Sequence, residues 1–324
     1  TALPAAAQEV TLKLHQFLPA QANVPARILD VWADNVEEAS GGRIEVERYP
    51  SMQLGGSPPQ LMDQAIDGVA DVVWTVVGYT PGRYPRTEVF ELPFFVEDAG
   101  AAAGAFWQLY EAEMQEEFSN VHLLGTWVHG PGLIHADREI RTPDDLSGVK
   151  VRGASRMVNQ LMETLGGTPV GMPIPAVPEA LSKGVIDATT MPWEVTAALK
   201  VPELVTYHTE FEGPALYTVT FVLAMNKARY DGLPDDLKQV IDDQSGLEFS
   251  VFAADEMVAV DAPARALAEE AGNTILTLSE AEAAVWRERA DPIYAAWVAE
   301  MEGRGIDGQA LIDEARRLMA EHGS

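Results

Sequence analysis

The segment AIDGVADVVWTVV, residues 65–77, passes from the end of a helix into a buried strand. The apolar spacing over residues 58–66 indicates a short helix, and Gly68 is typical of a helix end. Residues 72–77 form an apolar run whose length favours a buried strand. A second segment, ALSKGVIDATT at residues 180–190, repeats the order of short helix, glycine, aspartate and strand. This echo indicates two related halves, although ordinary helix termination would also produce it.

The same alternation continues outward from both segments. Strands are predicted over residues 10–14, 43–49, 121–128, 149–152, 185–190 and 217–225. Helices are predicted around residues 28–36, 99–118, 155–165 and 178–182. Alternating strands and helices predict an α/β fold with largely parallel sheets, and a second half of the chain begins near Gly130.

Beyond Met225 the sequence is typical of helices almost throughout. A helical run over residues 233–272 contains Pro263, which predicts a kink or break there. Ser279 followed by Glu282 is a capping box for a further helix that reaches about Met301, and a last helix follows it. A long helix in this region would link the two halves as a strut across a hinge.

Composition bounds the class of protein. A chain of 324 residues with 47% hydrophobic residues is long enough for two globular domains. Its 22 Lys and Arg residues against 50 Asp and Glu residues give a formal charge of −28. A polyanionic surface repels nucleic acid and anionic lipid, so no nucleic-acid partner is expected, and the charge serves solubility. Because there is no cysteine, disulfides, thiolate metal sites and cysteine nucleophiles are excluded.

The sequence also bears on location. It contains no stretch of about 18 apolar residues, so no membrane-spanning helix is predicted. Residues 1–9 are small and mostly apolar, and they resemble the tail of a removed secretory signal. Export from the cytoplasm is therefore expected.

Motifs of the common enzyme classes are absent. The sequence has no G-x-S-x-G, Walker loop, H-E-x-x-H or G-x-G-x-x-G motif. None of the 6 histidines pairs with another three or four positions away, as a helical metal site would require. We therefore expect a protein that is not an enzyme and that uses neither a metal nor a cofactor.

Several stretches together resemble one known family, the extracytoplasmic solute receptors of tripartite ATP-independent periplasmic (TRAP) transporters, of the dicarboxylate-binding type. Each stretch alone is weak evidence, but their order and spacing match the family from about residue 10 to about residue 245. They are SGGRIEV at 40–46, QLG at 53–55, ELPF at 91–94, LSGVKVR at 146–152, LGGTPV at 165–170, GVID at 184–187, NK at 226–227 and LPDDL at 233–237.

The resemblance implies a fold like that of periplasmic binding proteins, with two lobes, hinge strands and a long helix that spans both. Lobe I is expected to comprise residues 10–128 and 219–256, and lobe II residues 129–218 and 257–324 with the C-terminal helices across the hinge. The implied function is high-affinity binding of a small polar metabolite in the periplasm and its delivery to TRAP permease subunits. The receptor is expected to act as a monomer.

The resemblance also implies an anchor for the ligand. In related receptors the Arg at the end of a Gly-x-Lys-x-Arg strand clamps the substrate carboxylate, and Arg152 occupies that position here. A guanidinium offers a planar fork that grips a carboxylate through two parallel hydrogen bonds. An organic acid is therefore the first expectation for the ligand.

Two departures from the family keep a second ligand class open. Trp127 stands where many relatives have another Arg, and Met191 stands nearest to the place of a common Asn. Trp193 and Glu194 follow at once, and aromatic faces with a nearby carboxylate suit an ammonium group. A small amine or zwitterion thus competes with an organic acid, unless both Trp residues are wall residues and Glu194 faces solvent.

Further candidates follow strands of the first half. Gln16, Trp74 and Tyr79 lie where ligands meet open α/β sheets, and His129 lies beside the expected hinge. Some keto-acid relatives bind their ligand through a metal and use a Glu-Trp order that this chain lacks, so no metal is predicted. A sensory receptor with the same fold, which feeds a signalling partner, and an enzyme acting in the cleft are the alternative functions.

Overall fold

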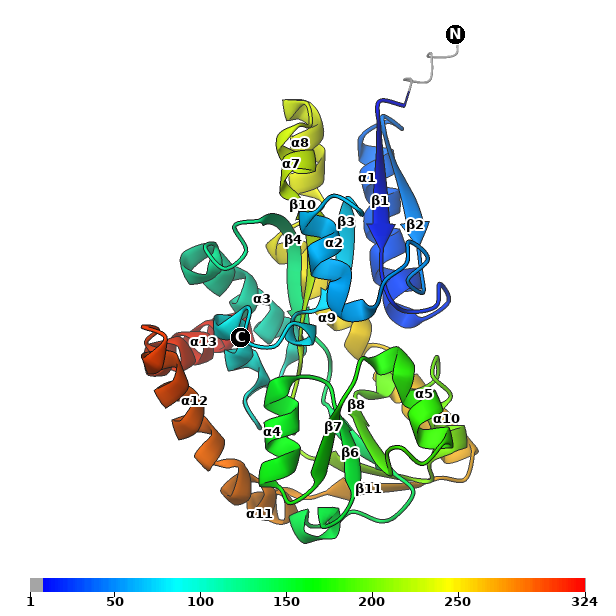
Figure 1. The fold of residues 1–324 in the computed structure, drawn as a ribbon, viewed down its shortest axis with the longest axis vertical. Helices are drawn as coiled ribbons and strands as arrows, with labels where there is room; N and C mark the ends of the chain where they lie inside the picture. The colour runs from blue at the N-terminus through cyan, green and yellow to red at the C-terminus, as the bar shows by residue number, and fades with distance from the viewer. Residues whose placement is uncertain (1–7, 324) are drawn as a thin grey trace.

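The computed structural model describes residues 8–323, which fold around two mixed β-sheets, one above the other in Figure 1. Most of the signal-like segment, residues 1–7, lies outside the described residues. The first sheet has the order β2-β1-β3-β10-β4, and the second has the order β11-β9-β5-β8-β6-β7. The strands of the first sheet are β1 (Val10–His15), β2 (Ile44–Tyr49), β3 (Val72–Val76), β4 (Val121–Val128) and β10 (Thr220–Asn226). Those of the second are β5 (Leu133–Ala136), β6 (Lys150–Gly153), β7 (Thr168–Gly171), β8 (Ala188–Met191), β9 (Tyr207–Phe211) and β11 (Thr274–Leu278).

The sheets are largely parallel, as predicted, but each contains one antiparallel strand. In the first sheet β10 runs against β3 and β4, and in the second β5 runs against β8 and β9. In both cases the chain crosses from the other sheet: β5 follows β4 of the first sheet after residues 129–132, and β10 follows β9 of the second sheet after residues 212–219. The two-lobe α/β prediction is therefore confirmed, with β4–β5 and β9–β10 as two of the connections between the lobes.

The sequence echo corresponds to a repeated hydrogen-bond pattern. The Asp71 backbone N–H donates to the Lys13 carbonyl at 3.0 Å, and the Lys13 N–H donates to the Asp71 carboxylate at 2.8 Å. Asp187 and Lys150 make the same two contacts, at 2.8 and 3.0 Å respectively. Helix termination alone would not require this pairing, so the two segments are equivalent parts of related lobes.

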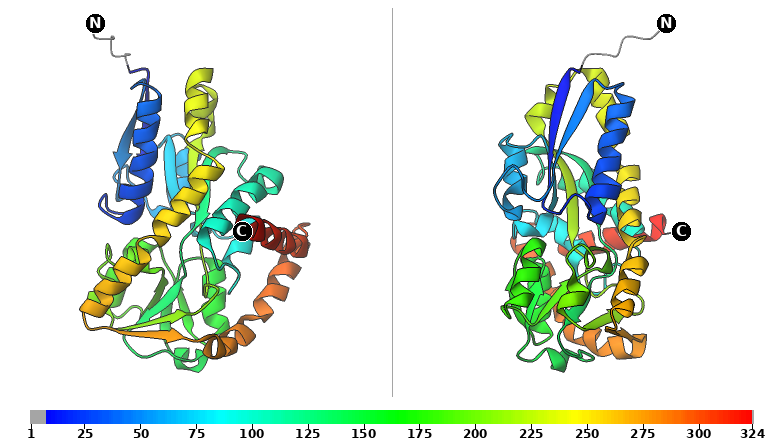
Figure 2. Two further views of the ribbon diagram at one scale, coloured as in Figure 1. Left: turned by 180° about the vertical axis from the view of Figure 1, so that it is seen from behind. Right: turned by 90° about the vertical axis from the view of Figure 1, so that its right-hand side faces the viewer.

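Helices cover both sheets. Helix α9 packs on α3 and β4 and leads into α10, and Figure 2 shows the two in succession along both sheets. Helix α13 packs across α3, where a Cβ at Gly104 would lie 2.7 Å from the His322 ring. The helices are α1 (Asp30–Ala39), α2 (Leu61–Ile66), α3 (Ala99–Leu109), α4 (Arg156–Thr164), α5 (Val177–Ser182), α6 (Val201–Leu204), α7 (Lys227–Asp231), α8 (Asp235–Asp243), α9 (Leu247–Val258), α10 (Asp261–Glu270), α11 (Glu280–Ala290), α12 (Pro292–Gly303) and α13 (Gly308–His322).

The C-terminal third differs from the helical prediction. The run over residues 233–272 is divided into α8, α9 and α10, and Gly246 stands at the first break with a φ of 87°. The second break lies at residues 259–260, so Pro263 falls in the first turn of α10, where its missing N–H costs nothing. Strand β11 was not predicted, and neither were β5, β7 and β9, because short strands carry little periodic signal. The capping box of Ser279 and Glu282 is confirmed, although α11 ends at Ala290 and α12 follows it.

The lobe boundaries stay a prediction. Helix α11 packs against β11 of the second sheet, whereas α13 packs against α3 beside the first. No helix among residues 8–323 is long and apolar enough to cross a membrane.

Candidate functional site

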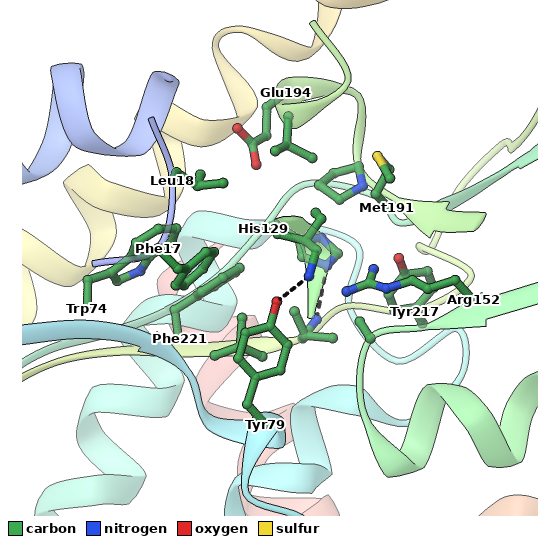
Figure 3. Close-up of a pocket in the computed structure, with 16 residues that line it drawn as sticks. Phe17, Leu18, Trp74, Tyr79, His129, Arg152, Met191, Glu194, Tyr217 and Phe221 are labelled. Carbon is green, nitrogen blue, oxygen red and sulfur yellow. Dashed lines mark hydrogen bonds between the residues drawn. The ribbon is translucent and has the colours of Figure 1, made fainter. Parts of the chain in front are cut away.

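A cavity lies between the two sheets, at the carboxyl ends of β3, β6 and β8, where ligands usually meet α/β sheets (Figure 3). About 390 Å³ at this site is free of protein atoms, a volume that includes space open to the surrounding solvent. Both lobes and both hinge connections contribute to its wall. The lining residues are Phe17, Leu18, Trp74, Val76, Tyr79, His129, Arg152, Ala154, Ile174, Met191, Pro192, Glu194, Val195, Tyr217, Val219 and Phe221.

Arg152 marks one end of the cavity. The side chain is buried on β6, and its Nε and Nη1 donate to the carbonyls of Met172 and Thr190 at 3.0 and 2.8 Å. These bonds fix the guanidinium plane and leave Nη2 without a backbone acceptor. Within residues 8–323, Arg152 belongs to none of the ion pairs with a carboxylate. A buried positive charge thus lacks a negative partner from the chain.

Two tyrosine hydroxyls accompany Arg152. The Tyr79 oxygen accepts the Ile174 backbone N–H at 3.0 Å, a contact between the lobes that leaves the Tyr79 O–H free to donate. The Tyr217 hydroxyl is buried without a hydrogen-bond partner in the described part of the chain. Burial raises the pKa of both tyrosines, and the Arg152 charge partly opposes this. Both hydroxyls therefore stay protonated and can donate beside Arg152.

A row of aromatic rings forms another wall. Trp74 stacks between Phe17 and Phe221 at centroid distances of 4.4 and 5.5 Å. Tyr79 meets the edge of Phe17 at 5.7 Å. The row exists because β10 inserts between β3 and β4 and brings Phe221 beside Trp74. Because these rings cover one another's faces, the row presents mainly apolar ring edges, which favour an aromatic group in edge-to-face contact.

His129 joins the two hinge connections. One ring nitrogen accepts the Val219 backbone N–H at 3.2 Å, and the other contacts the Gly130 carbonyl. Burial lowers the pKa of His129 to about 4, so the ring is neutral at pH 7. Because both nitrogens are occupied, His129 presents a ring face rather than a polar atom to the cavity.

Glu194 is the carboxyl group among the lining residues, and its backbone N–H donates to Asp261 at 2.8 Å. Burial and, to a lesser extent, the nearby Asp261 raise the pKa of Glu194 to about 8, although a hydrogen bond from Asn23 opposes them. Glu194 is therefore largely protonated at pH 7. No group of three or more metal-ligating side chains occurs within residues 8–323.

The structure brings together Arg152, Met191, Glu194, Trp74, Tyr79 and His129 but places the other three candidates outside the lining. Trp127 stacks behind Phe221 at 6.1 Å, and its indole N–H points to the Met257 sulfur. Trp193 donates its indole N–H to Glu210 at 3.0 Å, away from Glu194. The Gln16 amide donates to the Leu18 carbonyl at 2.8 Å, which holds the loop that carries Phe17 and Leu18.

Sequence reasoning missed three lining residues that matter to the chemistry: Phe17, Tyr217 and Phe221. Phe17 directly follows the candidate Gln16, so the error there is one position. Tyr217 and Phe221 lie in the apolar run 217–225, where aromatic residues look like ordinary core. No local signal distinguishes them.

Comparisons with known proteins agree with this geometry. A model of the family "Bacterial extracellular solute-binding protein, family 7" matches residues 18–301. A TRAP solute-binding protein of Rhodoferax ferrireducens T118, solved with copurified benzoate, is 49% identical over 97% of this chain and 98% of its own, with a TM-score of 0.95.

Two further relatives are also solute-binding proteins. A marine metagenome TRAP solute-binding protein, described as specific for aromatic acids and solved with 3-hydroxybenzoate, is 42% identical over 98% of this chain and 100% of its own, with a TM-score of 0.96. The C4-dicarboxylate-binding periplasmic protein DctP of Rhodobacter capsulatus is 26% identical over 80% of this chain and 78% of its own.

Proposed function

This chain belongs to family 7 of the bacterial extracellular solute-binding proteins, as a TRAP-type receptor, and we propose that its ligand is an aromatic monocarboxylate of the benzoate class. The prediction of an extracytoplasmic solute receptor, rather than an enzyme, is confirmed by the family match and the solved relatives. The identity of the ligand, its anchor and its delivery are the proposal.

The observation that carries the proposal is the buried Arg152 guanidinium, which has no carboxylate partner among residues 8–323. A buried charge is costly unless a partner compensates it, and the ligand carboxylate supplies that partner. The second N–H of Nη1, the two N–H groups of Nη2 and the Tyr79 and Tyr217 hydroxyls are the donors that remain for the two carboxylate oxygens. Charge-assisted hydrogen bonds of this kind contribute roughly 1.5–3 kcal/mol each.

The row of aromatic rings supports the second part of the proposal, that the ligand contains an aromatic ring. Phe17, Trp74 and Phe221 line the cavity as an apolar wall of stacked rings, away from the Arg152 end. A benzene ring fits such a wall, and an aromatic pair contributes about 0.5–1.5 kcal/mol beyond its buried area. The benzoate and 3-hydroxybenzoate held by the two related structures support the same chemistry here.

The alternative of an amine or zwitterion finds less support. Trp127 and Trp193 lie outside the lining, and the Glu194 carboxyl is largely protonated at pH 7. An ammonium group would therefore enter a cavity whose ionised group is the Arg152 cation. Coulomb repulsion in a buried site disfavours that arrangement.

We further propose that the lobes close over the ligand and present it to a TRAP permease. Two contacts between the lobes support closure: Tyr79 with the Ile174 N–H, and the Ser155 hydroxyl, which donates to Glu91 at 2.5 Å. A signalling partner in place of a permease would use the same closed state. Reconstituted transport with the membrane subunits distinguishes the two.

The ligand proposal is tested by titration calorimetry with benzoate, benzamide, benzylamine and succinate. Benzamide keeps the shape of benzoate without its charge, and benzylamine reverses the charge. We expect binding of benzoate and none of comparable strength by the other three. Preferential binding of benzylamine or succinate refutes the proposed ligand class.

A further inference from the structure

The carboxyl group of Glu194 has no role in anchoring a benzoate at Arg152. Its side chain is buried, with the residue 7% exposed, yet it belongs to the cavity wall. Figure 3 places Glu194 beside Leu18, on the other side of His129 from Arg152. A ligand held at Arg152 therefore meets Glu194 with its far end.

The hydrogen-bonding capacity of Glu194 is incompletely used. Asn23 donates to the carboxyl, and the Asp261 bond is made by the backbone N–H of Glu194. Burial and Asp261 keep the pKa of Glu194 near 8, so at pH 7 the group has an O–H to donate and an oxygen to accept. Its neighbours in the lining, Leu18, Pro192 and Val195, offer no polar side chain.

From this geometry we infer that Glu194 is a specificity-determining residue, which hydrogen-bonds a hydroxyl group on the 3 or 4 position of the ligand ring. This inference rests on the proposed function, because it takes the carboxylate to lie at Arg152. A ring hydroxyl both donates and accepts, so it can use the hydrogen-bonding capacity of the carboxyl that the bond from Asn23 leaves unused. The 2 position lies next to the carboxylate, at the Arg152 end, and is out of reach.

Two variants of the full-length protein separate the hydrogen bond from the shape of the side chain. Glu194→Gln keeps a donor and an acceptor in nearly the same volume, whereas Glu194→Leu keeps the volume without either. Titration calorimetry at pH 7 measures benzoate and 2-, 3- and 4-hydroxybenzoate on the wild type and both variants. Benzoate affinity reports that each variant is folded, and 2-hydroxybenzoate is the matched control ligand.

The wild type and Glu194→Gln are expected to bind 3- or 4-hydroxybenzoate about 2- to 10-fold more tightly than benzoate, as one hydrogen bond allows. Glu194→Leu is expected to bind 3- or 4-hydroxybenzoate no more tightly than it binds benzoate or 2-hydroxybenzoate, whatever its absolute affinity for benzoate. A preference that survives in Glu194→Leu, or is absent from the wild type, overturns the inference. Failure of the wild type to bind benzoate at all refutes the proposed function instead.

Discussion

Replacement of Arg152 by glutamine probes the proposed anchor most sharply. Glutamine removes the buried charge and the free Nη2, while its amide can still reach one of the carbonyls of Met172 and Thr190. Truncation of one partner of a buried, hydrogen-bonded charge pair costs about 2–5 kcal/mol of binding free energy. At 1.4 kcal/mol per tenfold, the Kd for benzoate should rise roughly 30- to 4,000-fold.

The stability of the ligand-free protein should respond differently. Arg152 is buried and has no carboxylate partner in the described chain, so its replacement removes a desolvation cost. We expect the melting temperature of the ligand-free variant to stay near that of the wild type, whereas the increase produced by benzoate disappears. Calorimetric titration and thermal unfolding on the same samples measure both.

Arg152→Lys is the matched control. It restores the charge without the planar fork and should recover part of the affinity. The reasoning is refuted if Arg152→Gln binds benzoate with unchanged affinity, because an uncompensated guanidinium would then have no part in ligand binding.

Three further predictions follow from the site. The pKa of Glu194 is about 8 in the folded protein, against 4.5 ordinarily, so between about pH 4.5 and pH 8 the folded state keeps a proton that the unfolded state releases, and stability falls as pH rises across that range. Glu194→Gln, which still faces Asp261 and Asn23, should therefore melt close to the wild type at pH 5 but several degrees higher at pH 9 by scanning calorimetry. Equal melting temperatures at both pH values would contradict the raised pKa. Tyr79→Phe removes the acceptor of the Ile174 N–H and one carboxylate donor, so benzoate should bind about 10-fold more weakly or worse by titration calorimetry, and an unchanged Kd would exclude that role. Phe221→Leu removes one ring beside Trp74 and should reduce the preference for benzoate over cyclohexanecarboxylate about 2- to 10-fold, whereas an equal loss for both ligands would mean general damage to the cavity.

Short sequence patterns correctly predicted the features that depend on residues close together in the sequence. The helix–glycine–aspartate–strand order gave the positions of Asp71 and Asp187, because each aspartate pairs with the strand beside it. Arg152 was placed at a strand end by its motif, and the strand end is where the structure has it.

The residues that form the aromatic wall could not be predicted from the sequence. Trp74 and Phe221 are neighbours because β10 inserts between β3 and β4, and nothing local in the sequence specifies that insertion. The same insertion puts Phe221 between Trp127 and the cavity. Trp127, which was predicted to bind the ligand, therefore lies behind the cavity wall. Trp193 likewise turns to Glu210, which comes from a strand that was not predicted.

A crystal structure of the protein with benzoate tests the central claim most directly. The account predicts the carboxylate within about 2.7–2.9 Å of the Arg152 guanidinium and the ring against Phe17, Trp74 and Phe221. Benzoate bound outside this cavity, or bound in it with its carboxylate turned away from Arg152, would contradict the account.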